Sequence, residues 1–362
     1  MIIKIFLFWR IGLFLIGYLG SRALPKVANG GIGAISPSNQ FDYWASWAQW
    51  DGGHYFEIAS HGYTKLSDYA FFPLFPLLTK FMSPLFVNNI IFSGLAVSGT
   101  VLLLALFVIY NYAAKKYGSE IALNTITSFL VFPTAFFAVA IYSESLFLLL
   151  AATTFIFLDH KKYLPAAIAA ALASLTRPVG IFLVISLFYS YFAHINFSLK
   201  RVDKNFLHLF VSLFGFSTYA IYLWSKLNDP FKFFSVQSIW ERNISNPIST
   251  ILYDVWVSMI RTRPFIDYLN LGSTLVFLIV LILGVRKISS SIWIFSVLVI
   301  LIPVSSGTLA SMPRYVLSSL GTFIIIGKFL EEKPWLKIPL WAMMLIAQSY
   351  LLVRFLNGYW VA

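Results

Sequence analysis

Long apolar runs separated by short basic loops dominate the sequence of this 362-residue chain. Most runs span about 17–22 residues, which is enough for an α-helix to cross roughly 30 Å of hydrocarbon. The alternation of apolar and polar positions that is typical of outer-membrane barrel strands is absent. The pattern therefore predicts an all-α polytopic membrane protein with about 11 transmembrane helices, within a range of roughly 9 to 13.

The first apolar run, residues 2–20, lacks a small-x-small cleavage site, so we expect it to be a retained signal anchor. The whole chain, residues 1–362, is expected to form a single transmembrane domain. Two longer polar intervals interrupt the apolar runs, and we expect residues 21–86 and 228–264 to form large loops. The other expected spans are 87–112, 121–140, 145–158, 164–175, 180–197, 206–226, 265–285, 292–309, 315–329 and 339–355.

Basic residues gather in the short loops on one side of this predicted bundle, with Lys115-Lys116 and Lys161-Lys162 as examples. Because cytoplasmic loops carry the excess of lysine and arginine, the N-terminus is predicted to be cytoplasmic and the C-terminus extracytoplasmic. The two large loops then fall on the outer face of the membrane. Three span ends that carry a charged residue fall there too, at Glu144, Arg177 and Arg314.

The composition supports a membrane protein and excludes some other classes. Hydrophobic residues make up 59% of the chain and the mean hydropathy is +0.81, whereas soluble domains are about 45–50% apolar. The net charge of +12 could suggest nucleic acid, but much of it lies in the short loops, so we expect no nucleic-acid partner. The absence of cysteine excludes disulfides and thiolate metal sites.

The interval from residue 41 to residue 76 carries the strongest candidate chemistry, because it places acidic residues among many aromatic ones beside a membrane. In WDGGHYFEIA, a helix that begins near Asp51 would place His54 and Tyr55 one turn along on the same side. The two glycines are expected to leave backbone exposed for close approach of a ligand. Asp51 could then act as a general base on a hydroxyl, with His54 orienting it or binding an anion. Alternatively, Asp51 only caps the helix.

Two aromatic patterns flank this motif. Trp44, Trp47 and Trp50 are spaced three apart, which predicts an amphipathic interfacial helix that aims them to one side, or a plain interfacial belt. The segment 70–76, AFFPLFP, is expected to be a rigid aromatic hairpin, because each proline restricts its predecessor. It would either seat the loop in the bundle or contact the substrate directly.

Four further residues are candidates for donor binding. Glu144, in YSES, is costly at membrane depth unless it faces a cavity or a partner, so it could hold a sugar hydroxyl or pair with Arg177. Arg177 and Arg314 each stand beside a proline at the outer end of a span, where a guanidinium suits a lipid phosphate or snorkels to the headgroups. Gln237 is the residue to watch in the 228–264 loop, whose first part otherwise reads as an interfacial helix.

No metal or cofactor site is expected from the sequence. The histidines are scattered without metal spacing, and His54 with His61 is too small a set for zinc. A P-loop, a GxGxxG motif and a Ser-His-Asp set are all absent from the sequence. Dependence on a divalent metal is left open.

Six motifs occur in one order between residues 41 and 320: WDGGHYFEIASHGY, AFFPLFP, IYSESLFLLL, ASLTRPVGI, NDPFKFFSVQSIW and SMPRYVLSS. Together they resemble the PIG-V-type family of GPI second mannosyltransferases and its prokaryotic relatives. That family is placed among the GT-C glycosyltransferases, multi-spanning enzymes that take a sugar from a polyprenyl-phosphate carrier at the non-cytosolic face. The resemblance implies an acidic base at Asp51 and a mannose donor on dolichyl or undecaprenyl phosphate.

The expected function is therefore that of an integral membrane glycosyltransferase. It would transfer a hexose, expected to be mannose, to a lipid or glycan acceptor at the outer face of the membrane, in a single inverting step with Asp51 as base. The phosphate leaving group would be held by His54, Arg177 or Arg314. A transporter or lipid flippase is the alternative, and it predicts ionisable groups near the bilayer midplane. A membrane scaffold would leave Asp51 freely replaceable.

Overall fold

The computed structural model describes residues 1–27 and 42–362, so residues 28–41 of the expected first loop, including Phe41, lie outside it. All the regular secondary structure of the described residues is helical, with α-helices, short 3-10 helices and no β-strand. The chain divides into two compact units. The first unit comprises Met1–Asp68, Phe75–Ser145 and Ile326–Ala362, and the second comprises Tyr69–Leu74 and Leu146–Ile325. The single domain expected from the sequence stays a prediction.

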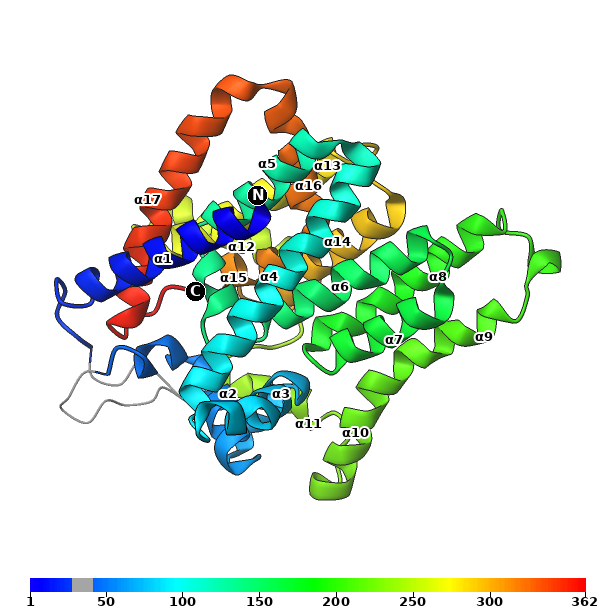
Figure 1. Ribbon diagram of the computed structural model, residues 1–362. Helices are drawn as coiled ribbons and strands as arrows, with labels where there is room; N and C mark the ends of the chain where they lie inside the picture. Colours follow the sequence, from blue (N-terminus) through cyan, green and yellow to red (C-terminus); the bar gives the residue numbers. More distant parts are fainter. Residues whose placement is uncertain (28–41) are drawn as a thin grey trace. The chain divides into compact units, whose positions relative to one another are not determined.

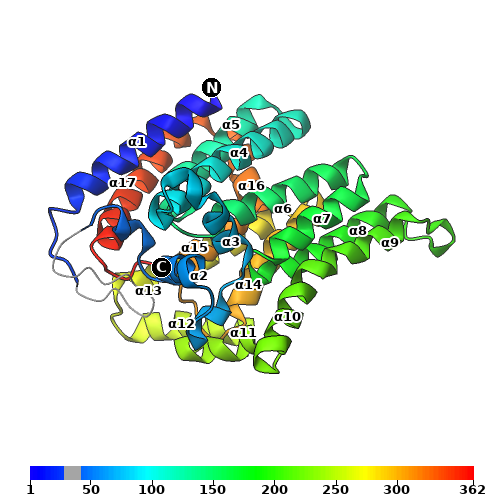
Figure 2. The ribbon, with the colours of Figure 1, turned by 60° about the horizontal axis from the view of Figure 1, so that its bottom comes forward.

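The first unit is built around two pairs of neighbouring helices. Helix α1 lies alongside α17, and α4 lies alongside α5 (Figures 1 and 2). The chain turns between α4 and α5 at Gly118, whose φ of 106° is readily adopted only by glycine. The helices of this unit are α1 (Ile2–Gly20), α2 (Asp51–His61), α3 (Leu74–Met82), α4 (Ile90–Tyr117), α5 (Ser119–Val131) and α17 (Lys337–Leu356).

One buried amide ties three helices of the first unit together. Gln348 of α17 accepts a hydrogen bond from the indole N–H of Trp9 in α1 at 3.0 Å. Its own amide N–H groups donate to the carbonyls of Leu130 at 2.8 Å and Phe132 at 2.6 Å, at the end of α5. Because the driving force for packing helices in lipid is small, such polar contacts contribute to holding spans together.

The second unit is centred on the alanine-rich helix α7, which packs against α8, α9 and α10. An added Cβ at Gly180 would lie 2.5 Å from the Ala173 carbonyl, and one at Gly215 would lie 1.8 Å from that of Ala171. Small residues thus allow close backbone contact on two sides of α7. The helices are α6 (Glu144–Asp159), α7 (Tyr163–Ser174), α8 (Leu183–His194), α9 (Asn205–Leu209), α10 (Phe214–Leu227), α11 (Lys232–Ser235), α12 (Pro247–Ile260), α13 (Phe265–Leu283), α14 (Ser290–Val304) and α15 (Met312–Tyr315). Helix α16 (Leu320–Glu332) belongs to the second unit up to Ile325 and to the first from Ile326.

Five helical stretches in the described part of the chain are long and apolar enough to cross a membrane. They are Ile2–Gly20, Ile90–Tyr117, Asn205–Leu227, Phe265–Leu283 and Pro334–Leu356. Shorter apolar helices, including Tyr163–Ser174 and Ser290–Val304, accompany them. The chain is therefore a multi-pass, all-α membrane protein as predicted, whereas the count of about 11 spans stays a prediction.

Two expected spans are interrupted where proline intervenes. The expected span 121–140 ends early, because α5 stops at Val131 just before Phe132-Pro133 and a 3-10 helix, Ala135–Val139, follows. The expected span 180–197 opens with the 3-10 helix Pro178–Phe182 before α8 begins. The expected loop 228–264 contains the helices α11 and α12.

Candidate active site

Asp51 is the first residue of α2, as the sequence predicted, and it is partly exposed. A tight turn precedes it, in which the N–H of Gly52 donates to the Gln49 carbonyl at 3.0 Å. Trp50 occupies the first central position of this turn with φ 57° and ψ −124°, which is the type II′ conformation that favours glycine. Trp50, rather than Asp51, is the N-cap, and no side chain caps the helix. Asp51 therefore lies in the first turn, where the helix dipole favours a carboxylate.

His54 forms a fully buried pair with Asp68, which lies in the 3-10 helix Leu66–Ala70. The Nδ1 atom of His54 and the Oδ1 atom of Asp68 are 2.8 Å apart, and the two side chains are 1% and 0% exposed. Burial raises the pKa of the Asp68 carboxyl. Hydrogen bonds from His54 and from the backbone N–H groups of Lys65 and Thr64 lower it by more, so the pKa lies below its usual value. Asp68 is therefore ionised at neutral pH.

Tyr55 connects α2 to the segment that leads into α6. Its hydroxyl is 2.7 Å from the Ser143 hydroxyl, and its ring contacts those of Phe75 and Tyr142, with centroids 5.2 and 6.3 Å away. Glu144, which follows Ser143, is the first residue of α6 and only 4% exposed. Tyr55, a predicted site residue, thus contacts the residue directly before Glu144, another predicted site residue.

The two glycines of the motif do not leave backbone exposed for a ligand, which corrects the expectation from the sequence, and Gly52 serves packing instead. Gly52 and Gly53 are both buried. A Cβ on Gly52 would lie 3.0 Å from the Tyr142 ring and 3.3 Å from the carbonyl oxygen of Ile141. Tyr142 is itself fixed, because its hydroxyl donates to the Gln49 carbonyl at 2.7 Å. The start of α2 is therefore clamped against residues 141 and 142.

The expected tryptophan stripe is not formed. The only helix before Trp50 in the described part of this loop is a four-residue 3-10 helix, Ala45–Ala48. Trp44 is 40% exposed, whereas Trp47 is completely buried. The Trp50 ring stacks edge-on against Trp360, with centroids 4.9 Å apart. Because the three side chains point into different environments, they do not form one interfacial face.

The prediction of an aromatic hairpin at residues 70–76 is also wrong, because the chain enters a helix there. Helix α3 begins at Leu74 and contains Pro76 in its first turn, where proline needs no hydrogen-bond partner for its nitrogen. Phe72, just before it, is 1% exposed and packs on the ring of Tyr219 at 4.6 Å. The hydroxyl of Tyr219 donates to the Tyr69 carbonyl at 2.9 Å. Residues 69–74 are thereby fixed within the second unit.

Three guanidinium groups of the second unit surround one tyrosine ring. The guanidinium carbons of Arg177, Arg242 and Arg314 lie 5.5, 5.4 and 5.4 Å from the centroid of Tyr315. Arg177 and Arg314 are only 7% and 5% exposed. Like charges gathered in a largely buried place attract an anion, and the planar guanidinium suits a phosphate in particular.

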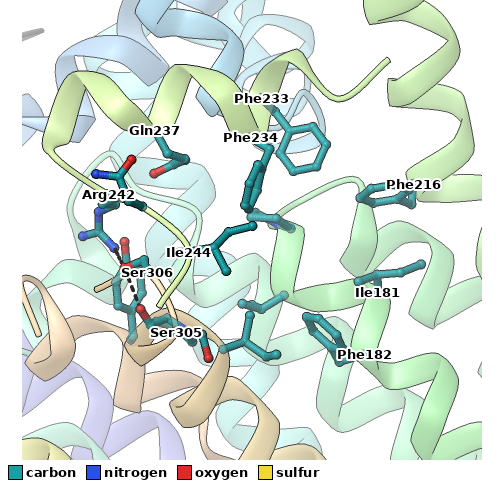
Figure 3. A pocket seen from close by; sticks show the side chains of 16 residues that line it. Ile181, Phe182, Phe216, Phe233, Phe234, Gln237, Arg242, Ile244, Ser305 and Ser306 are labelled. Carbon is teal, nitrogen blue, oxygen red and sulfur yellow. Dashed lines mark hydrogen bonds between the residues drawn. The ribbon is translucent and has the colours of Figure 1, made fainter. Parts of the chain in front are cut away.

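Arg242 also lines a cavity of about 430 Å³, on its polar side. Its guanidinium donates to the Ala310 carbonyl at 3.0 Å and to the Ser306 hydroxyl at 3.4 Å. Figure 3 shows Gln237 beside Arg242 on one side of the cavity and the phenylalanines on the other, with Ile244 lying between the two groups. The apolar part is lined by Pro178, Val179, Ile181, Phe182, Phe216, Phe233, Phe234, Ile302 and Pro303. The cavity therefore suits an amphiphile with an apolar chain and an anionic head.

A family model described as mannosyltransferase (PIG-V) matches residues 3–223, which is more than half of the chain. The chain belongs to the PIG-V mannosyltransferase family. The family resemblance inferred from the six motifs is thereby confirmed. Comparison of this PIG-V family chain with curated proteins found no match.

Among solved structures, the PIG-V family chain is similar to two described as ArnT from Cupriavidus metallidurans. With the one bound to undecaprenyl phosphate it shares 14% identity and a TM-score of 0.56, over 96% of this chain and 64% of that one. With the apo structure it shares 15% identity and a TM-score of 0.53, over 93% and 62%. This chain thus spans slightly less than two thirds of ArnT, and the likeness establishes that the PIG-V family chain has the GT-C fold.

Within residues 1–27 and 42–362 of the PIG-V family chain, no group of three or more His, Asp or Glu side chains is arranged to hold a metal ion. His54 is paired with Asp68. His61 lies instead against Glu57, with Nδ1 and Oε2 3.2 Å apart near the surface. The two histidines of the motif thus have separate carboxylate partners.

Sequence reasoning missed several residues of these sites in the PIG-V family chain. Asp68 was visible only as one of four acids in the first loop, and its contact with His54 depends on the fold. Ser143 precedes the predicted Glu144 and looks like an ordinary serine. Arg242 lies five residues after Gln237 in the loop that was expected to be interfacial, and Tyr315 directly follows Arg314. The last two could have been suspected from their neighbours.

Proposed function

We propose that this protein is a membrane glycosyltransferase that transfers a hexose, specifically mannose, from a polyprenyl-phosphate donor to a hydroxyl of a lipid or glycan acceptor. Sugar transfer takes place at the extracytoplasmic face, and the N-terminus is cytoplasmic. The observation that carries the proposal is the cavity whose aromatic walls end at Arg242. Membership of the PIG-V family supports the reaction type.

The cavity matches the two parts of such a donor. Its walls contain four phenylalanines, and Arg242 is the only charged residue among the described residues that line it. An isoprenoid chain loses apolar surface to water when it binds there, which is favourable by about 25 cal/mol per Å². The phosphate is then bound by Arg242, with Arg177 and Arg314 adding positive charge around Tyr315.

Asp51 supplies the base in this proposal. The acceptor oxygen attacks the anomeric carbon from the face opposite the phosphate, a new carbon–oxygen bond forms, and the bond from that carbon to the phosphate oxygen breaks. The hydroxyl proton passes to the Asp51 carboxylate, and the electron pair leaves with the polyprenyl phosphate. The anomeric configuration is therefore inverted.

Transfer of label tests the base. The purified protein in lipid nanodiscs is supplied with polyprenyl-phosphate-linked radiolabelled mannose and membrane lipids, and the labelled product is measured. Wild type is expected to transfer label, and Asp51→Asn to lose it by about 100-fold or more. Glu57→Gln, on the same helix but paired near the surface with His61, is the matched control and is expected to remain active. Equal transfer by wild type and Asp51→Asn would overturn the role of Asp51.

Donor binding is tested separately. Arg242→Ala removes a charge-assisted phosphate contact, so the KM for the donor is expected to rise roughly 10- to 100-fold, while Arg242→Lys is expected to recover part of the loss. Arg261→Ala, an exposed arginine after α12, is the matched control. An unchanged donor KM in Arg242→Ala contradicts the assignment of the cavity. Competition by polyprenyl-phosphate glucose measures the sugar preference, and the same assay with chelator measures metal dependence.

A further inference from the structure

The Asp68 carboxylate is bound on both oxygens. Its Oδ2 atom accepts hydrogen bonds from the backbone N–H of Lys65 at 2.8 Å and from that of Thr64 at 3.2 Å. Its Oδ1 atom lies 2.8 Å from Nδ1 of His54. These bonds hold Asp68 in one orientation, and the reaction proposed above assigns it no role.

This arrangement dictates where the imidazole of His54 carries its proton. An ionised carboxylate only accepts hydrogen bonds, so Nδ1 of His54 must be the donor in the 2.8 Å contact. Neutral His54 is therefore the Nδ1–H tautomer, and its Nε2 atom is the basic nitrogen. The second ring nitrogen of a histidine is set in this way by the bond that the first one makes.

His54 also lies at a useful place on α2. It follows Asp51 by three residues, and residues at this spacing are neighbours on a helix surface. Both are therefore presented by one rigid turn, which Gly52 clamps against residues 141 and 142. A second proton-carrying group beside the base is thus built into the first turn of the helix.

Few other ionisable groups lie in the elements packed against α2. The 3-10 helix Ala45–Ala48 contains no titratable residue, and those of α4 begin only at Tyr110, far along that helix. The segment before α6 contributes Tyr142, whose ring contacts that of Tyr55, and Glu144 follows as the first residue of α6. On α2 itself the others are Asp51, Tyr55, Glu57 and His61. Asp68 is in direct hydrogen-bond contact with His54.

We propose that Asp68 is a positioning residue that holds His54 as the Nδ1–H tautomer, and that Nε2 of His54 then accepts from Asp51 the proton of the acceptor hydroxyl and releases it to water after sugar transfer. This inference rests on the proposed function for its catalytic meaning. Its structural half, the tautomer of His54, is measured without any transferase activity.

The tautomer is measured by NMR on protein labelled with ¹⁵N-histidine, with the His54 signals assigned by their loss in His54→Asn. Wild type at alkaline pH is expected to show a protonated Nδ1 and an unprotonated Nε2. In Asp68→Asn the new amide can donate to Nδ1, so the Nε2–H tautomer is expected to appear. An Nε2–H tautomer in wild type overturns the proposal, whether or not any variant folds or transfers sugar.

The pH profile of transfer tests the catalytic half. The Asp68 carboxylate stabilises the protonated imidazole, so its loss in Asp68→Asn is expected to move the limb due to His54 to lower pH and to reduce kcat about 100-fold at neutral pH. Asp68→Glu keeps the charge and is expected to restore the wild-type limb in part. Glu57→Gln, which removes the carboxylate next to His61, is expected to leave the profile unchanged. A uniform loss of activity at every pH, with an unshifted limb, indicates a purely structural Asp68 and overturns this half.

Discussion

A methyl group at position 52 is expected to displace the candidate base. In Gly52→Ala the new Cβ would lie 3.0 Å from the Tyr142 ring and 3.3 Å from the Ile141 carbonyl oxygen. Neither neighbour can move aside easily. The Tyr142 ring is 1% exposed and its hydroxyl is bonded to Gln49, and the N–H of Ile141 donates to the Trp47 carbonyl at 3.1 Å. The first turn of α2 must therefore move instead.

The size of the effect follows from these distances. Ordinary contact begins near 3.4 Å, so α2 must shift by about 0.4 Å. Overpacking of this kind costs about 1–3 kcal/mol, which exceeds the roughly 0.5–1 kcal/mol that alanine gains over glycine in a helix. A misplacement of 1 Å can reduce a rate about 100-fold, so the shift of Asp51 predicts a roughly three- to tenfold lower kcat.

The assay compares Gly52→Ala with Gly99→Ala, both glycines lying in helices of the first unit. A Cβ on Gly99, within α4, would meet nothing within 4 Å, so this variant is expected to be as active as wild type and slightly more stable. Label transfer and the midpoint of thermal unfolding are measured on all three proteins. If Gly52→Ala equals Gly99→Ala in both measurements, the clamp on α2 is not rigid and the reasoning fails.

Three further changes follow from the structure. Trp360→Ala removes the ring that contacts Trp50 edge-on, with centroids 4.9 Å apart, so sugar transfer is expected to fall several-fold. Adding Trp50→Gly relieves the strained turn, in which Trp50 has a φ of 57°, and is expected to restore part of the lost transfer. A double variant no more active than Trp360→Ala would contradict the role of this strain. Burial raises the pKa of Asp68, but hydrogen bonds from an imidazole and two backbone N–H groups lower it by more, to below its ordinary value of 3.8. The ionised carboxylate therefore stabilises the fold fully above pH 3.8, and this stabilisation is lost as the pH falls through the folded pKa. The thermal unfolding midpoint should accordingly drop more steeply in acid for wild type than for Asp68→Asn, and parallel curves would show the sign to be wrong. Phe234→Ala removes part of the cavity wall and is expected to raise the KM of a long-chain donor about tenfold, but not the KM of a short-chain donor. Phe231→Ala, in the same loop but outside the cavity lining, should change neither KM. Equal effects of Phe234→Ala on both donors would contradict the position of the isoprenoid.

The sequence was most informative where the structure is local. The first span and the start of α2 at Asp51 were placed correctly, because apolar length and a short motif decide them. Contacts between distant segments could not be read in this way. Gly52 looks like a ligand-binding glycine until it is seen against Tyr142, which is ninety positions further along, and the importance of Asp68 depends on its contact with His54.

Aromatic segments were the other source of error. The spacing of the three tryptophans matches a helix, but the structure forms only a four-residue 3-10 helix there, and burial of Trp47 against Phe14 overrides the pattern. The two prolines after Ala70 suggested a hairpin, whereas Pro76 occupies the first turn of a helix that tolerates it. In both cases tertiary packing, which no single sequence window contains, decided the local structure.

The clamp on α2 also bears on how such an enzyme can change over time. Because a single methyl group at Gly52 is expected to disturb the base, the turn that carries Asp51 and His54 tolerates little variation. The cavity of the second unit is lined instead by side chains of interchangeable shape, including Ile181, Phe216 and Ile244. On the proposed function, new carrier lipids would therefore be accommodated by exchanging these hydrophobic residues, while the proposed proton transfer would be inherited unaltered.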